Sequence, residues 1–174
     1  MLFNLLDDAQ ISIISEWLHM KDLALLDSAC CNYGFRASFL RLTQLPQCIF
    51  PKYDLAATVD EARWILVREL KFREVAMFSE IMLDTQLCAQ LIASLGKSLT
   101  TLELSSWTCP EQRFEFSKNF LKIKDVVEAV AKNCVSLQSF TVTCDTSHVQ
   151  LGDALAETLT QNKLLDSVLL DNCD

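Results

Sequence analysis

Apolar residues recur along the last two-thirds of the chain in the pattern L-x-x-L-x-L, and each copy follows an amphipathic stretch with helical spacing. Successive copies begin 27, 38 and 28 residues apart. A period near 28 residues is typical of a solenoid, in which each unit buries its apolar edge against its neighbours. The four copies are Phe72-Val75-Met77, Leu99-Leu102-Leu104, Leu137-Phe140-Val142 and Leu165-Val168-Leu170.

The alternation of helical and strand-like stretches predicts the layers of this part of the chain. We expect a short α/β solenoid over residues 56–174, with about four units, parallel strands on the concave side and helices on the convex side. The residues that alternate with the apolar ones in each strand should point outward. This outward set is polar and mildly acidic: Glu74, Ala76, Thr101, Glu103, Ser105, Ser139, Thr141, Thr143, Ser167 and Asp171.

Residues 1–45 have a different, helical pattern. Asp7 and Gln10 have capping spacing, and apolar residues then recur at helical intervals. Pro46 and Pro51 punctuate residues 46–55, which predicts a linker or turn. The apolar positions of this helical segment are Ile11, Ile14, Trp17, Leu18, Leu23 and Leu26.

The 38-residue interval contains an insertion of about ten residues near 107–122, and it carries Trp107, Phe114 and Phe116. Repeat arrays place insertions as loops on one face. These rings are either an exposed anchor for a protein partner, because aromatic residues dominate binding hot spots, or a tether that packs the insertion on its own scaffold.

The fourth copy of the pattern lies at the C-terminal end of the chain. An uncovered last strand would leave backbone groups and apolar side chains in water. We therefore expect another chain or further repeats to cover it, unless Asp171, Asn172 and Asp174 protect the edge by charge.

Composition narrows the function classes. Hydrophobic residues make up 51% of the 174 residues, and the net charge is −8 without a basic stripe, which argues against a nucleic-acid partner.

The chain has no uninterrupted apolar run of about 18 residues, so no membrane span is expected. The N-terminus lacks the positive start of a secretory signal, and the eight cysteines are expected to be reduced in an intracellular, cytoplasmic or nuclear protein.

The residues that usually carry chemistry are sparse. There are two histidines, His19 and His148, and no C-x-x-C spacing, which argues against a zinc site. No glycine-rich phosphate loop is present. Cys144 and His148 are close enough in the chain for a thiol–imidazole pair, but Cys144 is better explained as a structural residue. We therefore expect no enzyme activity, no metal and no cofactor.

The repeats resemble the leucine-rich repeat family. Residues 126–144 are similar to its cysteine-containing subtype, with Cys134 and Cys144 at the two corners, and residues 151–173 are similar to its ribonuclease-inhibitor subtype. Residues 7–32 resemble an F-box, although Leu6 stands where that family has a proline and no tryptophan follows Cys30. The residues that match the F-box are Asp7, Ile11, Ile14, Leu18, Lys21, Asp22, Leu23, Leu26 and Cys30.

The F-box resemblance implies a substrate adaptor of a cullin ubiquitin ligase. The N-terminal helices would bind a Skp-type adaptor and the repeats would hold a substrate protein. Two other readings stay open: the helices only cap the open apolar end of the first repeat, or the chain is a non-catalytic structural subunit of a larger assembly. A thiol-dependent enzyme is the least favoured alternative.

Overall fold

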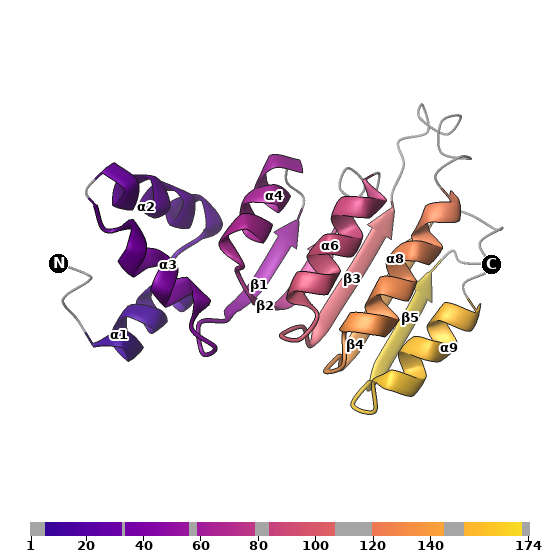
Figure 1. The fold of residues 1–174 in the computed structure, drawn as a ribbon. Coiled ribbons are helices and arrows are strands. Elements are labelled where there is room, and N and C mark those ends of the chain that lie inside the picture. The colour runs from indigo at the N-terminus through magenta and orange to yellow at the C-terminus, as the bar shows by residue number, and fades with distance from the viewer. Residues whose placement is uncertain are drawn as a thin grey trace.

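The computed structural model describes residues 6–32, 34–55, 59–78, 84–106, 120–144 and 152–171. A group of helices comes first, and strands then alternate with helices (Figure 1). The fold is therefore α/β, as predicted. The N-terminal elements are α1 (Asp7–Ser12), the π-helical turn η2 (Ile13–Trp17), α2 (Met20–Asn32) and α3 (Arg36–Gln44). The later elements are β1 (Phe50–Leu55), α4 (Val59–Arg68), β2 (Phe72–Met77), α6 (Thr85–Leu95), β3 (Thr101–Ser106), α8 (Phe120–Asn133), β4 (Ser139–Cys144), α9 (Gly152–Gln161) and β5 (Ser167–Asp171).

The five strands lie in the sheet in their chain order, and each neighbouring pair is parallel. A parallel strand needs a crossover connection to its neighbour, and here each crossover contains a helix. The four crossover helices, α4, α6, α8 and α9, lie side by side over one face of the sheet (Figure 1). The other face carries no helix among the described residues.

The first three copies of the apolar pattern form the core between the sheet and these helices, as predicted. Strand pairing places Val75, Leu102 and Phe140 in line across β2, β3 and β4. None of the nine residues of these copies is more than 2% exposed: Phe72, Val75, Met77, Leu99, Leu102, Leu104, Leu137, Phe140 and Val142. The three strands therefore share one register.

The fourth copy departs from the expectation of a buried stripe. Val168 and Leu170 are in register with Phe140 and Val142 but are 38% and 45% exposed. Among the described residues, β5 has a neighbouring strand on one side only, which leaves these side chains less covered.

Residues 50–55 were predicted to be the second half of a linker, and this is wrong. They form β1, which pairs with β2 from Phe50↔Phe72 to Leu55↔Met77. The alternating pattern is hard to recognise because Pro51 interrupts it, yet an edge strand tolerates a proline since one side of its backbone donates to no partner. Phe50 and Tyr53 both contact the ring of Phe72, with centroids 5.3 Å and 5.2 Å away.

A buried ion pair ties the N-terminal helices to the first crossover helix. Asp27 of α2 is 4% exposed. Its Oδ2 atom accepts hydrogen bonds from Arg68 Nε at 2.7 Å and from Trp64 Nε1 at 3.1 Å, both on α4. Buried apolar residues from Ile11 to Ala154 form one continuous cluster, so the helices and the sheet share a single core.

Two further polar contacts fix the N-terminal helices. Lys71 Nζ donates to the backbone oxygens of Gln44 and Leu45 at the end of α3. Asp7, expected as a helix cap, makes no cap hydrogen bond, because α1 begins at Asp7 itself and Leu6 precedes it. Instead the Asp7 carboxylate accepts two hydrogen bonds from Arg41, which lower its pKa.

Gly96 ends α6, and it lets α6 approach α8 closely. A Cβ atom at Gly96 would lie 2.6 Å from the backbone oxygen of Asn133, too close for any real contact. We expect Gly96→Ala to lower the free energy of unfolding by about 1–3 kcal/mol, because backbone on both helices must shift.

Urea denaturation followed by circular dichroism measures this effect. Gly152→Ala is the matched control, since a Cβ atom there would meet nothing within 4 Å. Equal stability of the two variants would contradict the close approach of α6 and α8.

Candidate protein-binding surface

The helix-free face of the sheet carries rows of side chains that strand pairing brings together. The first row runs across all five strands, and it consists of Lys52, Glu74, Thr101, Ser139 and Ser167. In the second row, Ala76, Glu103, Thr141 and Leu169 lie on neighbouring strands. Adjacent residues in such a row are about 4.8 Å apart, so the rows form one continuous surface.

Three of the outward residues are less accessible than predicted. Ala76, Ser105 and Thr143 are 5%, 1% and 9% exposed. Each has a short side chain on an interior strand, and Ser105 also donates a hydrogen bond to Glu103 Oε1 at 3.1 Å. Glu74, Glu103 and Thr141, which belong to the same outward set, are accessible.

The chemistry of this face is hydrogen bonding with a negative bias. Hydroxyl groups of Thr101, Ser139 and Thr141 can donate or accept, and Ser167 Oγ already donates to Ser139 Oγ at 2.9 Å. Carboxylates at Glu74 and Glu103 add acceptors for basic groups. Such a surface can form hydrogen bonds and attract basic groups.

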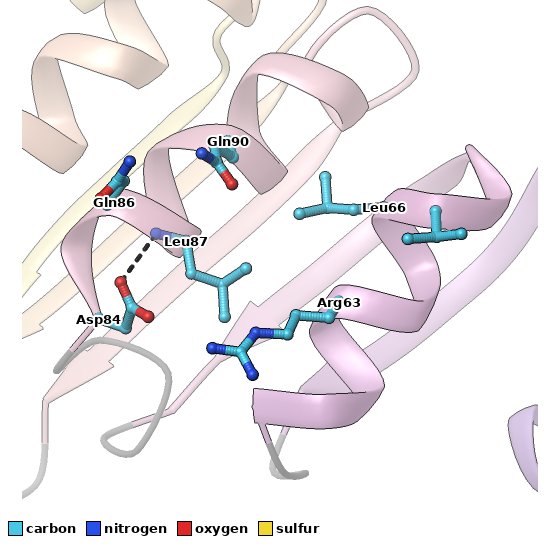
Figure 2. A pocket seen from close by; sticks show the side chains of 7 residues that line it. Arg63, Leu66, Asp84, Gln86, Leu87 and Gln90 are labelled. Carbon is cyan, nitrogen blue, oxygen red and sulfur yellow. Dashed lines mark hydrogen bonds between the residues drawn. The ribbon is translucent and has the colours of Figure 1, made fainter.

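A groove of about 540 Å³ lies between α4 and α6 on the helix-covered side (Figure 2). Figure 2 shows Arg63 extending from α4 toward the α6 side. Asp84 is occupied as the cap of α6, since its Oδ1 accepts from the backbone N–H of Leu87 at 3.0 Å. The lining of the groove combines three apolar side chains with two amides, one cation and one carboxylate. The lining residues are Arg63, Leu66, Val67, Asp84, Gln86, Leu87 and Gln90.

The six apolar positions predicted on the N-terminal helices divide into three groups. Ile11, Ile14 and Leu23 are between 0% and 7% exposed. The F-box resemblance implied that the N-terminal helices contact an adaptor, but these three residues belong to the core instead. Leu18 and Leu26 are half-buried against the same core.

Only Trp17 of the six is fully accessible, at 77%. Leu25 of α2 and Leu6 before α1 are similarly exposed, at 69% and 84%. Neither is among the six apolar positions predicted from the sequence. Leu25 lies two residues after the buried Leu23 on α2, roughly 200° around the helix, so its side chain points away from the core face.

Several predicted features lie outside the described residues. They include Trp107, Phe114 and Phe116 of the insertion, and also the pairing of Cys144 with His148, because neither His148 nor the Cys144 side chain is described.

Burial makes the described core thiols poor nucleophiles. It raises the pKa of Cys88 and of Cys134 to about 12, and it also raises the pKa of Cys30 and Cys48. A thiol with a raised pKa stays protonated at neutral pH, and the thiolate is the reactive form. These cysteines therefore serve as small apolar core residues.

Maleimide labelling of the native chain should distinguish the described cysteines by their rates of reaction. We expect Cys31, which is exposed, to react quickly, and Cys30, Cys48, Cys88 and Cys134 to react only after unfolding in urea. Mass spectrometry of digested peptides locates each label. Fast labelling of Cys88 or Cys134 in the folded chain would show that the core is open there.

Two searches of the described residues bear on other functions. No group of three or more histidine, cysteine or acidic side chains is arranged to hold a metal ion. No described helix combines the length and the apolar character needed to cross a membrane.

Comparison with protein-family models, with curated proteins and with solved structures finds no match for this chain.

Proposed function

We propose that this chain is a protein-interaction module: a short leucine-rich-repeat solenoid whose open sheet face holds a partner protein. The observation that carries the proposal is the row of polar side chains that crosses all five strands on the face without helices. The in-register apolar pattern, with one crossover helix for each strand pair, supports the solenoid architecture. A rigid sheet with exposed polar groups favours binding over catalysis, because its carboxylates and hydroxyls face solvent.

The partner on the sheet face should present basic groups. Glu74 and Glu103 lie on neighbouring strands, and the chain as a whole carries a net charge of −8. Complementary charge raises association rates and selects among partners.

The N-terminal helices have a second role in this proposal, which is to dock a Skp-type adaptor as an F-box-like unit. Trp17 and Leu25 support it, because large apolar side chains that are more than two-thirds exposed are typical contact residues. Ile11, Ile14 and Leu23 would position these side chains from the core side.

Binding of a purified Skp-type adaptor tests the docking role. We expect the chain to bind it in isothermal titration calorimetry, and we expect the double variant Trp17→Ala/Leu25→Ala to bind at least tenfold more weakly. Val67→Ala is the control, because Val67 is also exposed, at 70%, but lies on α4. A folded chain that does not bind the adaptor would remove this role and leave the sheet-face role standing.

Charge reversal tests the sheet face separately. Proteins that co-purify with the chain are identified by mass spectrometry, and Glu74→Lys/Glu103→Lys should lose them. Asp60→Lys/Glu157→Lys, with the same change of charge on exposed residues of α4 and α9, should retain them. Retention of the same proteins by both variants would contradict binding on this face.

A further inference from the structure

The helices that cover the sheet are not packed equally closely. α6 and α8 lie close together, since a Cβ atom at Gly96 would be 2.6 Å from the backbone oxygen of Asn133. α4 and α6 contact each other much less extensively than α6 and α8 do. The groove of about 540 Å³ lies at this wider junction, on the side of the sheet opposite the polar rows (Figure 2).

The two walls of the groove have the same spacing. Arg63 and Val67 are four residues apart on α4, and Gln86 and Gln90 are four residues apart on α6. Residues four apart on a helix lie on the same side of it, and about 6 Å separates them along the helix axis. Each wall therefore presents two contact positions that are one helical turn apart.

Apolar surface is open to solvent in this groove. Val67 is 70% exposed, which is unusual for a large apolar side chain next to a concave surface. Leu66 is half-buried and Leu87 is 5% exposed, so these two side chains lie deeper between the helices. An apolar side chain from another molecule would be buried against all three.

Arg63 is the charged group that a ligand can reach beside this apolar surface. Its Nη1 atom lies 3.8 Å from Asp60 Oδ1, and the two side chains are 63% and 91% exposed. Such a surface pair contributes little, so a second carboxylate can replace it. Asp84 is already compensated, because it accepts a hydrogen bond from the backbone N–H of Leu87 at the N-terminal end of α6.

The open shape of the groove favours a protein segment over a small molecule. The side chains of Arg63 and Val67 are 63% and 70% exposed, so a small molecule between them would stay largely in water. Small-molecule sites usually bury about 70–90% of their ligand. A helix laid along the groove would cover both walls and would match their one-turn spacing. The net charge of −8 works against a strongly acidic partner, so one carboxylate is the expected complement of Arg63.

We propose that the groove between α4 and α6 binds an amphipathic helix of a partner protein. One apolar side chain of that helix packs against Val67 and Leu87, and one carboxylate, a turn away, pairs with Arg63. The site contains neither the polar rows of the sheet face nor Trp17 and Leu25. It therefore stands or fails independently of the two roles proposed above.

Selection from a phage library of stapled helical peptides, with the full 174-residue chain as bait, tests the proposal. We expect the selected peptides to carry an aspartate or glutamate one turn from a large apolar residue. In fluorescence polarisation, Arg63→Glu and Val67→Lys should each weaken peptide binding at least tenfold without changing the circular dichroism spectrum, because both side chains are exposed. Arg36→Glu, the same change at an exposed arginine of α3, is the control and should bind normally. Failure to select any peptide, or binding that survives both variants, would overturn the proposal.

Exchange of charge gives a second test, which a mere disturbance of α4 would fail. A selected peptide with lysine in place of its acidic residue should bind the Arg63→Glu chain at least tenfold more tightly than it binds the unmodified chain. Laurate, titrated by isothermal titration calorimetry, is the probe for a small amphipathic anion. Laurate binding that Arg63→Glu abolishes, with no peptide selected, would assign the groove to a small molecule and reject the partner helix.

Discussion

Replacing Leu102 by aspartate is expected to produce the largest loss of stability of any substitution considered for this chain. Leu102 is fully buried on β3, in register with Val75 and Phe140. An aspartate there must either bury a charge without a partner or take up a proton, and both cost free energy. We expect a loss of about 4 kcal/mol or more, a large part of the total stability of a typical domain. Urea denaturation followed by circular dichroism measures it.

Thr141→Ala is the control for this prediction. Thr141 lies on β4, where it pairs with Glu103 on the outward face, so its loss should change the free energy of unfolding by no more than about 0.5 kcal/mol. If both variants lost the same stability, the assignment of the two faces of the sheet would be incorrect.

The second large effect is expected at Asp27. Asp27→Ala removes the acceptor for Arg68 and Trp64, and it leaves a guanidinium whose side chain is only 13% exposed without its counter-charge. Breaking a buried pair by removing one partner typically costs about 3–5 kcal/mol. Thermal unfolding monitored at 222 nm should show a correspondingly lower Tm.

Two comparisons make the Asp27 prediction specific. Asp7→Ala breaks the exposed pair with Arg41 and should have a much smaller effect, because surface ion pairs contribute little. The double variant Asp27→Leu/Arg68→Met should recover much of the lost stability, since apolar residues of similar size can replace a buried pair. An Asp27→Ala chain as stable as Asp7→Ala would mean that α2 and α4 are held together by apolar packing alone.

The α/β fold and four of the five strands could be predicted from the sequence because their signal is local. Each of these strands repeats the same apolar spacing, and each is preceded by a helical stretch. β1 lacks that signal: Pro51 breaks its alternation, and its identity depends on pairing with β2, which the sequence does not display. Asp27 was missed for a similar reason. A carboxylate between Leu23 and Cys30 on the apolar side of α2 is a sign of a buried pair, but its partners are 37 and 41 residues away.

The candidate surface was predicted less completely than the fold. Alternation along the strands correctly assigned Glu74, Glu103 and Thr141 to the outward face. It could not show that Ala76, Ser105 and Thr143 are buried, because accessibility depends on the side chains that surround a residue in the fold. On the N-terminal helices, helical spacing identified apolar residues without separating Ile14, which is in the core, from Trp17, which faces solvent.

The order of strands in the sheet has a consequence for how such a protein changes over evolution. In the part of the chain that the structure describes, each strand pairs only with the strands just before and after it, and the crossover helices follow the same order. Duplication or loss of a whole helix–strand segment between β2 and β4 would therefore require new contacts only at the junction where the segment is inserted or removed. Such a change would lengthen or shorten the sheet and leave the contacts of Asp27 and Lys71 intact.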